Sequence, residues 1–259
     1  MTRAILSVSV DAMRYPGKAS AADLIRGVRI DVPAGSFVSI LGRSGSGKTT
    51  LLRVIAGLER RFAGTVRLAG IDVKGPTRDI QIVFQDNRLL PWKTAKGNIE
   101  FALPRTVVQD TVVDDWIAKV GLTKERDSWP KALSGGQEGR VAFARVFIDP
   151  PRVLLLDEPF RNLDVIARLE LQGVLTSYLG SSATTVIMVS HNIEDALALS
   201  DEIYVVTSCP LTVAERVKVP ISRPRERNSE LLRAMEAELE AALKRQMVLG
   251  LGEEILCQI

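Results

Sequence analysis

The sequence is poor in cysteine and histidine. Its 259 residues include two cysteines, Cys209 and Cys257, and one histidine, His191. The cysteines lie far apart and neither is near the histidine, so their spacing excludes a zinc site and does not indicate a disulfide framework. We therefore expect an ordinary apolar core and a reducing compartment.

Long apolar runs and an excess of one charge are also missing. No run approaches the roughly 18 apolar residues of a membrane span, and the N-terminus lacks the features of a signal peptide. These absences predict a soluble protein that reaches a membrane only through a partner. The 34 Lys and Arg against 31 Asp and Glu leave a formal charge of +3, which does not indicate a nucleic-acid partner.

The first motif that indicates a function is a glycine-rich loop. It follows the apolar run 36–41 and precedes a stretch with helical spacing of leucines and isoleucine. The loop matches G-x-x-x-x-G-K-[ST] completely, and Thr50 adjoins it. The matching residues are Gly42, Arg43, Ser44, Gly45, Ser46, Gly47, Lys48 and Thr49.

This pattern predicts a phosphate-binding loop, because its glycines let several backbone N–H groups converge on phosphate oxygens at a helix N-terminus. Lys48 is then expected to reach the β- and γ-phosphates, and the Thr49 hydroxyl to bind Mg²⁺. A chance glycine-rich turn is the simpler alternative, but the preceding strand and following helix oppose it. Kinases, GTPases and many ATPases share such a loop, so it does not name the class.

Apolar strands alternate with helices along most of the chain. Runs at 36–41, 153–157 and 184–190 read as buried strands, and 165–178 reads as a helix. This alternation predicts an α/β fold with a parallel sheet. The first 33 residues and 64–73 read as β-structure; residues 86–150 read as helical and therefore as an insertion. After Val206 the pattern weakens, until an amphipathic helix is predicted over 229–247.

Two further motifs narrow the class. Leu133-Ser134-Gly135-Gly136-Gln137 precedes the strand Val153–Asp157 by about twenty residues, and Glu158 follows that strand. Together with the phosphate loop they resemble the nucleotide-binding subunits of ABC transporters over about residues 3–215. That resemblance implies a P-loop NTPase (RecA-like) parallel-sheet core, an N-terminal antiparallel β subdomain and an inserted helical subdomain. The predicted domains are 1–215, with the insertion at about 86–150, and 216–259 as linker and helix.

The resemblance implies that ATP and Mg²⁺ bind and that ATP joins two copies of the chain. Ser134, Gly135, Gly136 and Gln137 of one copy are expected to close over the ATP of the other, since glycine N–H groups at a helix N-terminus form an anion site. At the strand end, Asp157 is suited to Mg²⁺ and Glu158 to polarising the attacking water. Two acids in this position could alternatively cap a turn.

Four more site residues follow only from the resemblance. His191 matches a switch histidine at the γ-phosphate, and Gln85 a glutamine that reaches Mg²⁺ and water. Tyr15 lies where the family stacks an aromatic on adenine, and Asp164 in a loop between subunits. The simpler alternatives are a structural histidine, an exposed glutamine and an aromatic in a Pro-Gly turn.

The chain also departs from the family pattern at two places. Glu138-Gly139 replace a basic and a polar residue, which is expected to weaken the helix start or alter a contact. Arg161-Asn162 replace the usual Ser-Ala, which is expected to alter coupling between the two sites.

The segment Leu89-Leu90-Pro91-Trp92 and the tail SRPRER resemble importers of the nitrate, sulfonate and taurine group. This implies a peripheral place on the cytoplasmic side of the membrane, bound to integral-membrane permease subunits, with an extracytoplasmic solute-binding protein in the complex. The alternatives are a P-loop kinase or GTPase, a DNA-repair or chromosome ABC ATPase, and an ABC-type ATPase with a binding or regulatory role. The first would have no reason to carry LSGGQ, and the second carries longer inserts.

Overall fold

The structure is a computed structural model that describes residues 4–14, 23–103, 110–208, 210–223, 225 and 229–257. It divides into two compact units. Unit 1 comprises Met1–Ile80 and Thr185–Ile259, and unit 2 comprises Gln81–Thr184. Among the described residues, no helix combines the length and the apolar character needed to cross a membrane.

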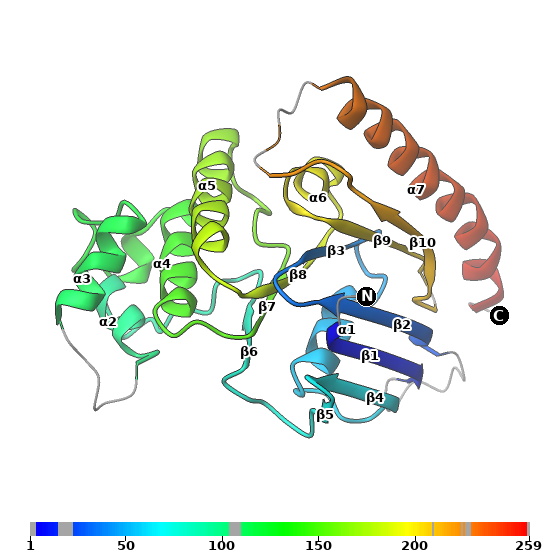
Figure 1. Ribbon diagram of the computed structural model, residues 1–259, viewed down its shortest axis with the longest axis horizontal. Coiled ribbons are helices and arrows are strands. Elements are labelled where there is room, and N and C mark those ends of the chain that lie inside the picture. The colour runs from blue at the N-terminus through cyan, green and yellow to red at the C-terminus, as the bar shows by residue number, and fades with distance from the viewer. Residues whose placement is uncertain are drawn as a thin grey trace. The chain divides into compact units, whose positions relative to one another are not determined.

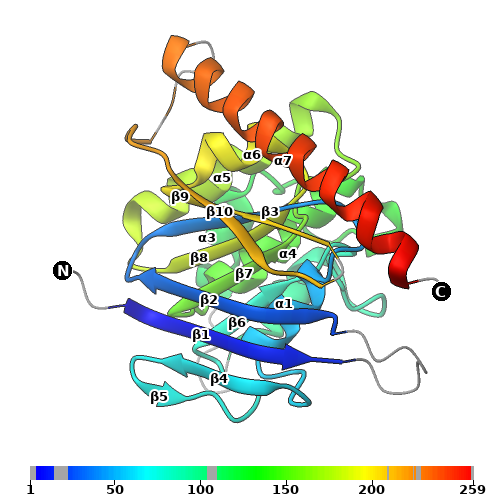
Figure 2. The same cartoon turned by 90° about the vertical axis from the view of Figure 1, so that its right-hand side faces the viewer.

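The first sheet of unit 1 is antiparallel, as predicted. Its strands are β1 (Ala4–Met13), β2 (Ile25–Pro33), β4 (Ala63–Leu68) and β5 (Ile71–Asp72), in the order β2-β1-β4-β5 (Figure 2). Val28, Ile30 and Val32 are buried, while the charged residues between them are exposed. This strict alternation explains why the sheet was predictable from sequence.

The second group of strands in unit 1 carries the parallel part of the core. Strands β10 (Val213–Lys218), β9 (Glu202–Val206), β3 (Phe37–Leu41) and β8 (Thr185–Ser190) are neighbours in that order. β3 runs parallel to both β8 and β9, and Leu41 pairs with Ser190. Every residue of β3 is buried, as its uninterrupted apolar run predicts. Helix α1 (Lys48–Ile55) follows β3 and contacts β8.

Strand β10 is a finding that the sequence pattern did not predict. It pairs antiparallel with β9 and alternates half-buried with exposed residues. Arg216 of β10 donates to both carboxylate oxygens of Glu202 at 2.5 and 2.8 Å. Burial, with Glu202 beside it, raises the pKa of Tyr204 to about 12, so this phenol stays neutral at ordinary pH. Three of its six residues are charged, so the sequence shows only a weak apolar alternation and does not predict a strand.

The C-terminal helix α7 (Glu230–Cys257) packs on unit 1 beside α6 (Ile193–Leu199) and β9 (Figure 1). Its predicted apolar face is confirmed, with Leu232, Met235 and Leu239 buried and Leu243 packed against the same cluster. Within the preceding SRPRER stretch, the described residue Arg225 donates to the Leu197 carbonyl at 2.5 Å.

Unit 2 is mainly helical over its described residues, and at 81–184 it extends beyond the predicted insertion of about 86–150 to include β7 and α5. In the described part of this unit, two neighbouring strands, β6 (Ile80–Val83) and β7 (Val153–Asp157), accompany four α-helices and a 3₁₀ turn. The helical elements are α2 (Ala95–Glu100), α3 (Asp110–Lys119), η1 (Pro130–Ala132), α4 (Gly135–Phe147) and α5 (Val165–Ser181).

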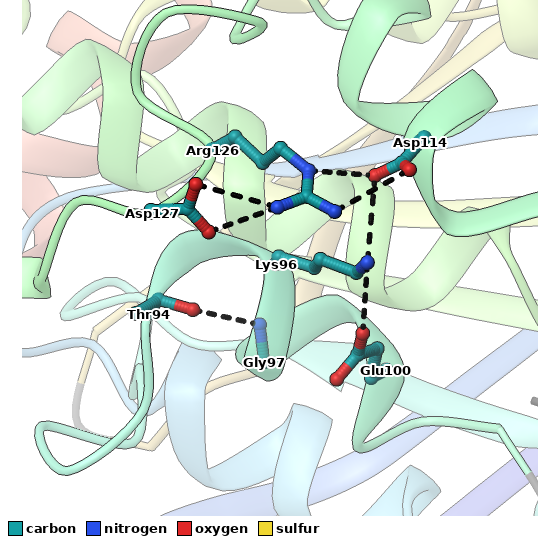
Figure 3. Close-up of polar contacts among 7 residues, drawn as sticks. All are labelled: Thr94, Lys96, Gly97, Glu100, Asp114, Arg126 and Asp127. Carbon is teal, nitrogen blue, oxygen red and sulfur yellow. Dashed lines mark hydrogen bonds and ion pairs between the residues drawn. The ribbon is translucent and has the colours of Figure 1, made fainter. Parts of the chain in front are cut away.

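Charged side chains link α2 and α3 to the segment at Arg126. Arg126 lies 2.9 Å from Asp114 and 3.0 Å from Asp127, and Lys96 lies between Glu100 and Asp114 (Figure 3). The Arg126 hydrogen bond lowers the pKa of Asp114. The sequence predicts that Thr94 caps a short helix, and this is confirmed, because its hydroxyl accepts from the Gly97 N–H at the start of α2 at 3.1 Å (Figure 3).

Two expected apolar positions are wrong. The helical spacing after the glycine-rich loop predicts that Leu58 is buried, but α1 ends at Ile55 and Leu58 is 49% exposed. Gly57, with φ of 70°, has already turned the chain away. The apolar spacing at 112–120 predicts that Val112 shares a buried face with Val113 and Ile117, but Val112 is 38% exposed while the other two are buried.

Candidate functional site

The glycine-rich loop lies between β3 and α1, as predicted. Gly45 and Gly47 have φ values of 82° and 97°, in the left-handed region that favours glycine. A Cβ on Gly42 would lie 2.7 Å from the Val206 side chain, so close packing requires glycine there. The chain therefore bends sharply here because glycine permits these backbone conformations and the close packing at Gly42.

Lys48 brings its positive charge to this loop. Its Nζ donates to the carbonyls of Gly42 at 2.8 Å and Arg43 at 2.6 Å, and the residue is only 4% exposed. The ammonium group thus lies against the loop backbone. A fixed cation beside a turn of glycine N–H groups suits a phosphate chain.

Ser46 supplies a second indication of an anion. Its hydroxyl is buried and has no hydrogen-bond partner among the described residues. Buried hydroxyls are normally paired, because an unpaired one loses its water contacts without replacement. A phosphate oxygen would accept this hydrogen bond.

His191 lies at the same edge of unit 1 as the loop. It follows β8 directly, and the Gly42 N–H donates to the Ser190 carbonyl at 3.3 Å. The side chain is exposed. Since β3 and β8 are parallel neighbours, their carboxyl ends place the loop and His191 next to each other. Sequence spacing over 140 residues did not show this adjacency.

In unit 2, Asp157 ends β7 and Glu158 begins the following turn. Asp157 is 3% and Glu158 9% exposed, which is deep burial for carboxylates. Glu158 has a φ of 46°, a conformation that residues other than glycine adopt infrequently. The backbone therefore turns sharply at the residue predicted to direct water.

Gln85 lies in the turn after β6 and is exposed. Its loop is fixed by Arg145 of α4, which donates to the carbonyls of Asn87 and Arg88, both at 2.8 Å. Burial lowers the pKa of Arg145. The role of Arg145 could not be predicted from the sequence, because its acceptors are backbone carbonyls more than fifty positions away and leave no side-chain pattern.

The LSGGQ segment forms the N-terminus of α4. The Ser134 hydroxyl accepts from the Gln137 N–H at 3.3 Å, and the Gln137 side chain accepts from the Ser134 N–H at 2.9 Å. This capping box satisfies two N–H groups of the helix end. α4 runs unbroken from Gly135 through Glu138 and Gly139, and a Cβ on Gly139 would lie 3.1 Å from Leu171 of α5. The expected effects of Glu138-Gly139 on the helix start and on a contact stay predictions.

The remaining predicted residues have mixed outcomes. Asp164 caps α5 by accepting from the Ala167 N–H at 2.9 Å, so a structural role is present whatever its other roles. Thr49 is half-buried and Thr50 buried on α1, while Arg43 and Ser44 are exposed. Tyr15 lies outside the described residues.

Residues 25–161 match the family described as ABC transporter. This chain belongs to the ABC transporter family. It is similar to the aliphatic sulfonates import ATP-binding protein SsuB of Cupriavidus necator, at 42% identity over 90% of this chain and 75% of the relative. A second relative, aliphatic sulfonates import ATP-binding protein SsuB 1 of Xanthomonas axonopodis pv. citri, is 41% identical over 85% of this chain and 90% of its own length.

Solved ABC structures agree with the fold. The dimeric ATP-binding cassette MJ0796, described as a post-hydrolysis state bound to ADP and Pi, matches with a TM-score of 0.74 and 26% identity. The match covers 84% of this chain and 100% of that one. The ABC family assignment confirms the α/β P-loop fold and identifies the chain as an ATP-binding, ATP-hydrolysing subunit.

Proposed function

We propose that this ABC subunit binds ATP with Mg²⁺ through the residues described above and powers a solute importer of the nitrate, sulfonate and taurine group. The observation that carries the nucleotide part is the loop itself. Lys48 holds a buried cation against it, and the Ser46 hydroxyl lacks a partner among the described residues. Both features suit the phosphates of ATP.

The donor set fits Mg²⁺. Thr49, Gln85 and Asp157 offer oxygen atoms, and Mg²⁺ prefers oxygen ligands with only one or two carboxylates beside substrate phosphates. When bound, Mg²⁺ supplies positive charge to the β- and γ-phosphates. In this proposal Thr49, Gln85 and Asp157 would each offer an oxygen ligand to Mg²⁺, and Gln85 would also orient the attacking water.

The chain's own groups divide the remaining chemistry. Lys48 binds phosphate oxygens, and loop N–H groups orient them in line for attack. Glu158 accepts a hydrogen bond from the attacking water and directs it at the γ-phosphate, as a general base does. His191, at the phosphate-loop edge of unit 1, would contact the γ-phosphate. The N-terminus of α4 in a second copy completes the charge around the nucleotide.

Import is supported by the names of the relatives and by an exposed apolar loop. Trp92 is 68% exposed, although large aromatic side chains are usually buried. Its loop is held by the buried Asn98, whose side chain bonds the backbone of Leu90, Lys93 and Thr94 over 2.7–3.2 Å. We infer that this rigid loop contacts the permease, which places the subunit peripherally on the cytoplasmic side of the membrane. A solute-binding protein completes the complex.

The alternative, an ABC-type ATPase without transport, is not favoured because the reported relatives are named import ATP-binding proteins. The alternative of a P-loop kinase or GTPase is excluded by the match to the ABC transporter family.

Two substitutions test the catalytic assignment. Glu158→Gln keeps the size of the side chain and removes its basicity, so we expect ATP binding to persist and turnover to fall by about 100-fold or more. Lys48→Ala, by contrast, is expected to weaken ATP binding in addition to lowering turnover. Nucleotide binding and phosphate release are measured on the same preparations. Hydrolysis by Glu158→Gln near the wild-type rate would remove Glu158 from this role.

A further inference from the structure

Arg161 contacts two of the proposed catalytic side chains. Its Nη1 atom lies 3.2 Å from Glu158 Oε2 and 3.4 Å from Gln85 Oε1. Gln85 and Arg161 are 76 positions apart, yet both belong to unit 2. One nitrogen therefore links the turn after β7 to the loop after β6.

The backbone directs Arg161 toward Glu158. The Arg161 N–H donates to the Glu158 carbonyl at 3.1 Å, and both Glu158 and Asn162 have positive φ values, 46° and 61°. Asparagine adopts this conformation more readily than most residues. The Arg161-Asn162 pair, noted above as a departure from the usual Ser-Ala, thus forms a tight turn that returns the guanidinium over the buried carboxylate.

Arg145 fixes the backbone of the Gln85 loop, but it does not hold the Gln85 side chain. Arg145 holds the carbonyls of Asn87 and Arg88, whereas Gln85 itself is exposed. Arg161 adds a contact to the amide oxygen. Restricting an exposed side chain near its working orientation lowers the entropy lost when the reacting groups assemble.

We propose that Arg161 is a positioning residue for hydrolysis, holding the Glu158 carboxylate and the Gln85 amide in a common orientation. This rests on the proposed roles of Glu158 and Gln85. A carboxylate accepts about four hydrogen bonds, so a bond from Arg161 to one oxygen is compatible with a bond from water. A planar guanidinium suits two acceptors, whereas an ammonium is a point charge.

A purely structural ion pair is the competing explanation. Arg161 is 41% exposed and Glu158 9%. Because the Glu158 carboxylate is buried, this explanation predicts that removing Arg161 lowers thermal stability and leaves turnover unchanged. The positioning role instead predicts a change in kcat without a matching change in KM.

The main test compares Arg161→Ser and Arg161→Lys with Arg152→Ser in the purified full chain. Arg152 is also exposed and in unit 2, but it precedes β7, at the opposite end from Glu158. We expect Arg161→Ser to lower kcat about three- to tenfold, with KM for ATP within about twofold and unchanged thermal stability. Arg161→Lys should recover part of the rate, and Arg152→Ser should match wild type.

A double-mutant cycle checks that Arg161 acts through Gln85. In a Gln85→Ala background, Arg161→Ser should lower kcat by a smaller factor than in wild type, because one of its two acceptors is gone. Additive effects in this cycle would overturn the proposal. So would an unchanged kcat in Arg161→Ser, or a raised kcat, which would mean that the contact restrains Glu158.

Glu158→Gln separates the two levels of inference. If it hydrolyses ATP near the wild-type rate, the catalytic assignment of Glu158 fails, and the positioning proposal fails with it. If it is inactive while Arg161→Ser behaves like wild type, only the positioning proposal fails.

Discussion

Ser46 shows how one side chain can report on a ligand. The residue is 1% exposed, and its hydroxyl lacks a hydrogen-bond partner among the described residues. An unmet buried hydroxyl destabilises the fold by about 1–3 kcal/mol, and a bound phosphate oxygen would recover that loss. Stability and binding therefore respond in opposite ways to its removal.

Ser46→Ala is accordingly expected to leave the unliganded protein as stable as wild type, or slightly more stable. ATP affinity should fall about ten- to a hundredfold, since a hydrogen bond to a charged acceptor such as a phosphate oxygen contributes about 1.5–3 kcal/mol. Thermal unfolding without nucleotide and titration with ATP measure the two effects. A clear loss of stability without nucleotide would show that the hydroxyl is paired inside the protein.

At the scale of elements, the packing of α4 against α5 depends on glycine. A Cβ on Gly136 would lie 2.9 Å from the Ala167 Cβ, and one on Gly139 3.1 Å from Leu171. Gly173, inside α5, would meet no atom within 4 Å. Gly136 and Gly139 thus lie where α4 and α5 approach closely, whereas Gly173 lies on an open part of α5.

These contacts predict opposite effects for the same substitution. Gly136→Ala should lower the free energy of unfolding by about 1–3 kcal/mol through overpacking. Gly173→Ala should raise it by up to about 1 kcal/mol, because alanine favours the helix interior. Urea unfolding is followed by tryptophan fluorescence, which reports on unit 2 because all three tryptophans, Trp92, Trp116 and Trp129, lie there. Equal shifts in both variants would contradict the packing argument.

At the scale of the whole molecule, the proposal requires two copies of the chain. The Ser134–Gln137 segment is at a helix N-terminus, and Ser134 and Gly135 are exposed, so a second copy can reach them. ATP held by the phosphate loop of one copy would meet the N–H groups of the other. Hydrolysis would then release the pair.

We therefore expect Glu158→Gln to form a dimer with ATP and Mg²⁺ and to stay monomeric without nucleotide. Adding Ser134→Arg in the same background should prevent dimer formation while leaving ATP binding to the loop in place. Sedimentation velocity measures the assembly, and nucleotide titration measures the binding. A Glu158→Gln protein that remains monomeric with saturating ATP would contradict the shared-site mechanism.

Sequence by itself determined the features with a local physical cause. The phosphate loop was recognisable because glycine at Gly45 and Gly47 permits a backbone that other residues rarely adopt. Buried strands such as β3 and β7 were recognisable from unbroken apolar runs, and the Thr94 cap from its hydroxyl before a helix. The resemblance of the motifs then supplied the family.

Only the tertiary structure decided which distant groups meet. The hold of Arg145 on the Gln85 loop, the contact of Arg161 with Gln85, and the adjacency of His191 to Gly42 each join residues more than fifty positions apart. Their partners are backbone atoms or single polar groups, which leave no periodic pattern in a sequence. Strand β10 was missed for a related reason, because Arg216 gains its partner Glu202 only once the strands pair.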